Sequence, residues 1–289
     1  MFWMLGVALA GPLPEGIDLE DVTAWEERAF AMPDGPPGCW VFHGEFQARA
    51  AIYHPATFFS RGETDIRAAT GTFVGTLTDG EWTRFVYTIT DPGESEEDGL
   101  QISTNDDALT LFPLVGRLDP AIIERDPSQP PPVQTEEEEG RQVSISFGSD
   151  GEASSEEAVN LLRGSVEEWW DASVTTSYMR WDEALDGAWL VVEVPTSDER
   201  GAELVTMNAF FPGAGEHATR IDSILPRRLS VGDGFIKAKV MNGQLHLEGR
   251  VVDGRLMPVT ESWGAVLGAL GFTVGYEQRI AYTSAQECP

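Results

Sequence analysis

Residues 40–53 carry the longest clean alternation of apolar and polar side chains in the chain. Trp40, Phe42, Phe46, Ala48, Ala50 and Ile52 fall on one face, and His43, Glu45, Gln47 and Arg49 fall on the other. This period of two predicts a β-strand with one buried face. At about 3.3 Å per residue such a strand would extend roughly 46 Å, about the width of a compact protein of this length. We therefore expect the strand to curl, bulge or break, and Gly44 is one place for it.

Further strands are predicted along the rest of the chain from the same alternation. Dipeptides typical of two-residue hairpin turns separate several of them, at Asp79-Gly80, Asn242-Gly243 and Asp253-Gly254. The predicted strands are 70–78, 81–90, 100–104, 109–115, 173–181, 188–194, 203–211, 216–225, 235–241, 244–252, 255–261 and 272–283.

Two segments have the period of amphipathic helices. Residues 18–32 place Leu19, Val22, Trp25, Ala29 and Met32 on one stripe, with Asp18 as the cap. Residues 155–172 follow a capping box formed by Ser154 and Glu157. Residues 263–275 suit a buried helical turn that runs into a strand. The fold class predicted is α+β and mainly antiparallel β, a strongly curved sheet or partly open barrel with two main amphipathic helices packed on it.

A segment rich in proline and glutamate divides the chain. Residues 126–142 contain Pro130-Pro131-Pro132 and four successive glutamates at 136–139. Because such residues do not pack into a core, this segment is a linker or long surface loop. We expect one β-rich domain over residues 11–289, with halves at 11–125 and 143–289.

The N-terminus and the cysteines favour an extracytoplasmic, periplasmic or secreted protein. Residues 2–10 are apolar and end in Ala8-Leu9-Ala10, which is the pattern of a signal peptide over residues 1–10. The Lys or Arg that usually precedes the apolar stretch of a signal peptide is missing here. The chain has two cysteines, Cys39 and Cys288. In an oxidising compartment we expect them to pair, although two unpaired thiols are the alternative.

The charge balance excludes several partners. The chain holds 19 Lys and Arg against 48 Asp and Glu, and its net charge is −29. A generic nucleic-acid binder needs a basic surface, and so does a protein that binds anionic membrane surfaces. The acidic composition therefore excludes nucleic acids and anionic membrane surfaces as partners. Because no stretch of 18 apolar residues occurs, no transmembrane helix is expected.

Catalytic and metal-binding motifs are absent from the sequence. His43 and Glu45 share a strand face and are weak catalytic candidates, and His246 lies on a similar polar face; the simpler interpretation of each is a solvated strand surface. A hydrolase would require His43 or His246 to reach a carboxylate within a cleft. No cofactor and no metal site are expected. Calcium is the ion that the acidic loops would suit best, but no calcium-binding loop motif is present.

Aromatic residues are the remaining indication of function. A cavity between a curved sheet and its helices could hold a lipid-like or other apolar ligand, although a filled core is the simpler interpretation. Its predicted lining is Trp40, Phe42, Phe46, Trp169, Trp170, Phe272 and Tyr276.

The order of helices and strands resembles that of the half-barrel lipoprotein carriers of the bacterial periplasm, a likeness of architecture that carries no motif. It implies a non-enzymatic binding protein. The alternatives are a secreted hydrolase with a His/Glu site, and a structural or protein-interaction module without a small-molecule site.

Overall fold

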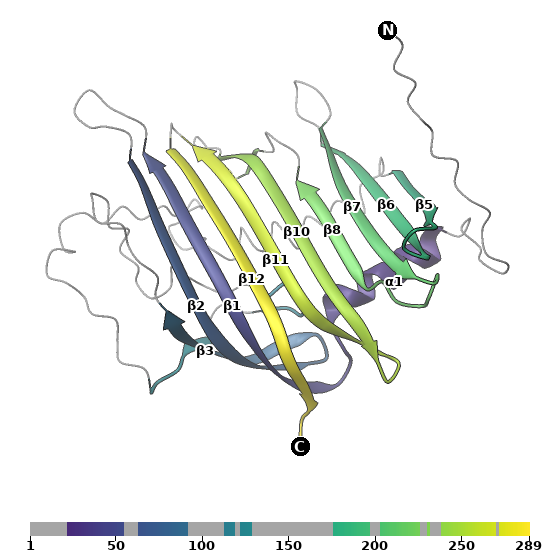
Figure 1. Cartoon of the computed structure of the whole chain (residues 1–289), viewed down its shortest axis with the longest axis horizontal. Helices are drawn as coiled ribbons and strands as arrows, with labels where there is room; N and C mark the ends of the chain where they lie inside the picture. Colours follow the sequence, from purple (N-terminus) through teal and green to yellow (C-terminus); the bar gives the residue numbers. More distant parts are fainter. Residues whose placement is uncertain are drawn as a thin grey trace, which may run out of the picture.

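The computed structural model describes residues 22–54, 63–91, 113–118, 122–128, 176–196, 203–225, 230–231, 238–269 and 272–289. Twelve strands in these residues form one sheet, which is antiparallel except where β4 runs parallel to β3. Its order is β4-β3-β2-β1-β12-β11-β10-β8-β7-β6-β5, and β9 also pairs with β10. Figure 1 shows most of these strands lying side by side.

The helix and strands have the following bounds: α1 Val22–Asp34, β1 Cys39–His54, β2 Glu63–Thr78, β3 Glu81–Asp91, β4 Ile123–Arg125, β5 Thr176–Asp182, β6 Gly187–Thr196, β7 Glu203–Pro212, β8 Arg220–Leu225, β9 Ser230–Val231, β10 Ala238–Val252, β11 Arg255–Ala269 and β12 Phe272–Glu287. The predicted β-rich, mainly antiparallel fold is confirmed. The sheet is open, because β4 and β5 end the strand order without pairing with each other in the described residues.

The long alternating strand β1 lies inside the sheet, between β2 and β12. The register between β1 and β12 shifts at His43 and Gly44, and Thr283 of β12 is left as the extra residue of a bulge. A Cβ atom on Gly44 would lie 2.2 Å from the ring of Phe73. The irregularity expected at Gly44 is confirmed.

One face of the sheet carries the core. The alternating apolar residues of β1 pack there against rings from β2 and β3, and Phe42 and Phe73 are almost fully buried. Helix α1 covers part of the same face, where Trp25 meets Phe211 edge-to-face at 4.9 Å. The predicted stripe of this helix is buried at Trp25, Ala29 and Met32.

A buried carboxylate attaches a further segment to this core. Glu261 of β11 is fully buried, and its Oε2 accepts hydrogen bonds from the backbone N–H groups of Leu114 (2.9 Å) and Val115 (3.2 Å). The indole N–H of Trp82 donates to the carbonyl of Val115. Residues 113–118 are therefore held against the sheet by polar contacts as well as by packing.

The expectation of two main helices packed on the sheet is not borne out. The described part of the chain contains one short helix, α1, and the second predicted helix at 155–172 lies outside it. Predictions at 1–21, 100–104 and most of 126–142 also lie outside the described residues. Residues 113–115 of the predicted strand 109–115 are described and belong to no strand.

Two local predictions near the C-terminus are wrong. Asn242-Gly243 is not a turn, because β10 continues through it while Gly243 pairs with Leu225 on one side and Ala265 on the other. Residues 263–269 form no helical turn but the second half of β11. The turns at Asp79-Gly80 and Asp253-Gly254 are confirmed, and all four of their residues have positive φ.

Candidate ligand-binding pocket

Strands β11 and β12 part near the C-terminal end of β12. Their pairing stops at Thr260 and Ala281, although β12 continues beside β1 as far as Glu287 and β11 extends back beside β10 to Arg255. Just beyond the last pair, each strand carries an extra residue against its other neighbour, Val259 in β11 and Thr283 in β12. A bulge bends its strand and strengthens the local twist, so two adjacent bulges direct the strands apart.

Pro258 adds a second reason for the separation. Proline has no N–H, so it cannot donate a ladder hydrogen bond to β12. On the other edge, the hydroxyl of Thr283 donates to the carbonyl of His43 at 3.1 Å, which ties the β12 bulge to β1. The opening between β11 and β12 therefore follows from identifiable residues.

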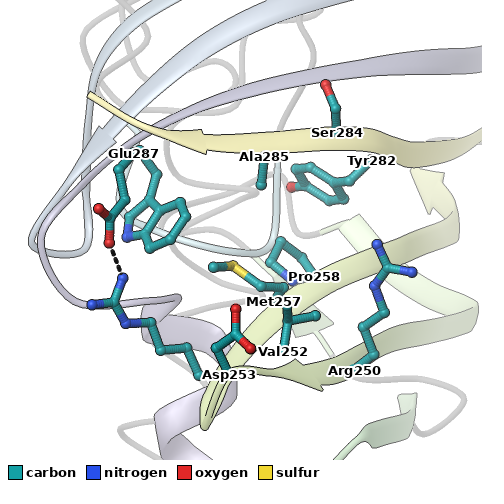
Figure 2. Close-up of a pocket in the computed structure, with 11 residues that line it drawn as sticks. Arg250, Val252, Asp253, Met257, Pro258, Tyr282, Ser284, Ala285 and Glu287 are labelled. Carbon is teal, nitrogen blue, oxygen red and sulfur yellow. Dashed lines mark hydrogen bonds and ion pairs between the residues drawn. The ribbon is translucent and has the colours of Figure 1, made fainter. Parts of the chain in front are cut away.

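A pocket of about 500 Å³ lies at this opening (Figure 2). Its volume falls in the range of roughly 300–1,000 Å³ that small-molecule sites have. Six of its residues supply apolar or aromatic surface: Trp40, Val252, Met257, Pro258, Tyr282 and Ala285. Five supply polar groups: Arg250, Asp253, Arg255, Ser284 and Glu287.

The charged side chains of the pocket differ in their pairing. Arg255 forms an ion pair with Glu287, and its guanidinium lies 5.2 Å from the ring centroid of Trp40. Within the described residues, the side chains of Arg250 and Asp253 form no ion pair or hydrogen bond. Figure 2 shows Arg250 at the end of the pocket near Tyr282 and Ser284, with Glu287 at the opposite end.

The predicted disulfide is present and borders the pocket. Cys39 and Cys288 are joined across the ends of β1 and β12, next to Trp40 and Glu287, which pair with each other in the sheet. The backbone N–H of Cys288 also donates to the carbonyl of Cys39. The cross-link therefore fixes one wall of the pocket.

Of the predicted cavity residues whose side chains the structure describes, only Trp40 lines this pocket. Trp40 lines the pocket, whereas Phe42 and Phe46 pack edge-to-face with Trp82 and Tyr87 in the core. Tyr276 lies further along β12, where its ring is 4.8 Å from that of Trp263, and burial raises the pKa of its phenol above the ordinary value. Trp169, Trp170 and the side chain of Phe272 lie outside the described residues.

The weak catalytic candidates lie on the polar face of the sheet, opposite the face that carries the core. His43 and Glu45 are both exposed there. His246 is different, because its Nδ1 lies 2.7 Å from Oδ1 of Asp222, whose other oxygen accepts a hydrogen bond from Arg220. Ser262 pairs with His246 on its other side. None of these residues, Asp222, His246, Ser262 or His43, lines the pocket of Figure 2.

The described ranges contain neither a metal-binding cluster nor a membrane-spanning helix. No group of three or more His, Cys, Asp or Glu residues there could hold a metal ion. No helix there is long and apolar enough to cross a membrane.

Sequence reasoning missed most of the pocket. The sequence predicts strands at Arg250, Met257 and Tyr282 but assigns none of them to a site. The available signal was Pro258 within a predicted strand, since proline inside a sheet marks an edge or a bulge. The position of the bulge at Val259 had no comparable signal.

Comparisons with known proteins show no family for this chain. No protein-family model and no curated protein matches it. A solved structure described as "Lipid-protein interactions in lipovitellin" is similar, at 9% sequence identity and a TM-score of 0.28. The match covers 88% of this chain and 26% of that one, so the chain spans about a quarter of the protein it resembles. At this TM-score the likeness supports no conclusion about function.

Proposed function

We propose that the protein is an exported, non-enzymatic binding protein that holds a lipid-like or other apolar ligand in the pocket between β11 and β12. The observation that carries this proposal is the pocket itself, with its wall of Trp40, Met257 and Tyr282. Burying apolar ligand surface there would contribute about 25 cal/mol per Å². The disulfide supports export, because disulfides persist in oxidising compartments.

Filling the pocket tests this function. Ala285 lines the pocket, so Ala285→Phe places a ring inside it. Ala281 lies on the same strand but outside the pocket, and Ala281→Phe is the matched control. We expect 1-dodecanol to bind the wild type and Ala281→Phe in calorimetric titrations, and to bind Ala285→Phe at least about tenfold more weakly. Equal binding by all three proteins, or no binding by the wild type, would count against the proposal.

A second candidate function, hydrolysis, rests on the row formed by Asp222, His246 and Ser262. The 2.7 Å contact at Nδ1 orients the imidazole, as an acid does in hydrolase triads. Ser262, the cross-strand neighbour of His246, would be the nucleophile. Covalent labelling by a fluorophosphonate, lost in Ser262→Ala and His246→Gln, would support hydrolysis. Unchanged labelling in both variants, or no labelling of the wild type, would rule this site out.

A further inference from the structure

The unpaired charges of the pocket constrain the ligand beyond its apolar part. Arg255 and Glu287 neutralise each other, so they leave no net charge for a ligand to complement. The remaining charges are the guanidinium of Arg250 and the carboxylate of Asp253. These two groups form no ion pair with each other or with other described residues, although both line the same pocket.

The fold places these two charges at fixed positions. Arg250 pairs with Met257 in the β10–β11 hairpin, and Asp253 begins the two-residue turn of that hairpin with φ at 51°. Both residues therefore belong to one hairpin, which lies opposite the wall formed by β12 (Figure 2). A ligand lying against Met257 and Tyr282 would therefore share the pocket with one positive and one negative side chain of the protein.

We propose that this pocket recognises a zwitterionic amphiphile, with an anionic group at Arg250, a cationic group at Asp253 and the hydrocarbon part against Trp40, Met257 and Tyr282. This inference rests on the proposed binding function and adds the headgroup chemistry. Arg250 and Asp253 are exposed in the free protein, so a ligand that covers them would remove water from both. A singly charged ligand would then leave one of the two protein charges uncompensated, which weakens binding. The protein's net charge of −29 adds a general repulsion of purely anionic ligands.

Three probes with the same dodecyl chain separate the contributions of the headgroup. Dodecylphosphocholine carries both charges, dodecyl phosphate only the negative charge and dodecyltrimethylammonium only the positive charge. Each is titrated calorimetrically below its micelle concentration. We expect dodecylphosphocholine to bind at least about fivefold more tightly than either singly charged probe.

Two variants test which side chain of the protein recognises which charge of the ligand. Arg250→Gln should remove the advantage of dodecylphosphocholine over the cationic probe, and Asp253→Asn should remove its advantage over the anionic probe. Arg84→Gln is the control for a lost exposed arginine on a strand. Asp186→Asn is the control for a lost turn carboxylate, because Asp186 has a similar φ of 50° in the turn between β5 and β6. Both controls should bind all three probes as the wild type does.

The outcomes distinguish this inference from the function on which it rests. If 1-dodecanol binds but the three charged probes bind equally, the headgroup inference is overturned and the binding function stands. If Arg250→Gln and Asp253→Asn keep the wild-type preference, the inference is likewise overturned. If neither 1-dodecanol nor any charged probe binds, both proposals fail.

Discussion

Gly44 illustrates how a single residue sets a feature of the fold. Its position beside the ring of Phe73 and the carbonyl of Ala281 leaves no room for a side chain, since an added Cβ would lie 2.2 Å and 2.6 Å from these groups. The sequence allowed this irregularity to be predicted, because an unbroken strand of this length would span about the full width of a compact protein of this size. The partner strand that would carry the extra residue could not be predicted, since it depends on the pairing with β12.

Gly44→Ala should destabilise the protein by about 2–3 kcal/mol, because the methyl group displaces a packed ring and backbone. Gly275→Ala on β12 is the control, since a Cβ there would meet its nearest atom at 3.8 Å. Urea unfolding of both variants measures the difference. Equal midpoints for Gly44→Ala and the wild type would contradict this packing.

Glu261 makes a second prediction at the scale of one residue. Glu261→Ala leaves the N–H groups of Leu114 and Val115 without their acceptor, and each unsatisfied buried donor costs roughly 1–3 kcal/mol. We expect the amides of residues 114 and 115 to lose hydrogen-exchange protection while those of β5 and β6 keep theirs. Unchanged protection at 114 and 115 would show that the carboxylate does not hold this segment. Nothing in the sequence around Glu261 indicated its role, since its partners lie far away in the chain.

Among the elements, those with clean alternation were predicted well and those with conflicting local signals were not. Strands β1, β3, β6 and β7 begin and end close to the predicted residues. Asn242-Gly243 favours a hairpin turn and so predicts two strands within residues 235–252. In the structure, Gly243 has partners on both β8 and β11, and these long-range pairings override the local preference.

The segment that follows β4 carries a carboxylate with a shifted pKa. Hydrogen bonds from the backbone N–H and the hydroxyl of Ser128, with a further one from Thr88, hold the pKa of Asp126 below its ordinary value. A depressed pKa means that the ionised carboxylate stabilises the folded state above the unfolded pKa. This contribution is lost as the pH falls through the folded pKa.

Asp126→Asn should therefore flatten the acidic part of the stability curve without changing its shape near neutral pH. Thermal unfolding between pH 2 and pH 7 measures this effect, and NMR titration of the Asp126 carboxyl carbon gives the direction of the shift. Asp34→Asn is the control, since it removes another exposed carboxylate. An Asp126 pKa at or above the ordinary value would contradict the hydrogen bonding described.

The disulfide gives a prediction for the β1–β12 pair. A cross-link between residues 249 apart stabilises by about 3–5 kcal/mol on the chain-entropy model. The double variant Cys39→Ser/Cys288→Ser should lose about that much stability in urea unfolding. It should also lose amide protection first at residues 284–287, which include Ser284, Ala285 and Glu287 of the pocket lining. An unchanged unfolding midpoint would show that the cross-link leaves stability unaltered.

At the scale of the whole molecule, the sheet joins the two halves of the chain. Strands β1 to β4 come from residues before the Pro/Glu-rich segment and β5 to β12 from residues after it, and β1 and β12 bring them together. The pocket lies beside this junction, where neither half alone supplies all of its lining. This explains why the site could not be assembled from sequence. Trp40 and Met257 are distant in the chain, and the two bulges mark where β11 and β12 part.

The most direct test of ligand binding at this junction is methyl NMR of the methionines during a titration with dodecylphosphocholine. The Met257 methyl lies in the pocket, whereas Met32 and Met207 are buried in the core outside it. We predict that the Met257 signal shifts with saturation, while the Met32 and Met207 signals stay in place, and that Ala285→Phe abolishes the shift. Saturable shifts at other methionines with none at Met257, or no shift at any methionine, would contradict binding in the pocket between β11 and β12.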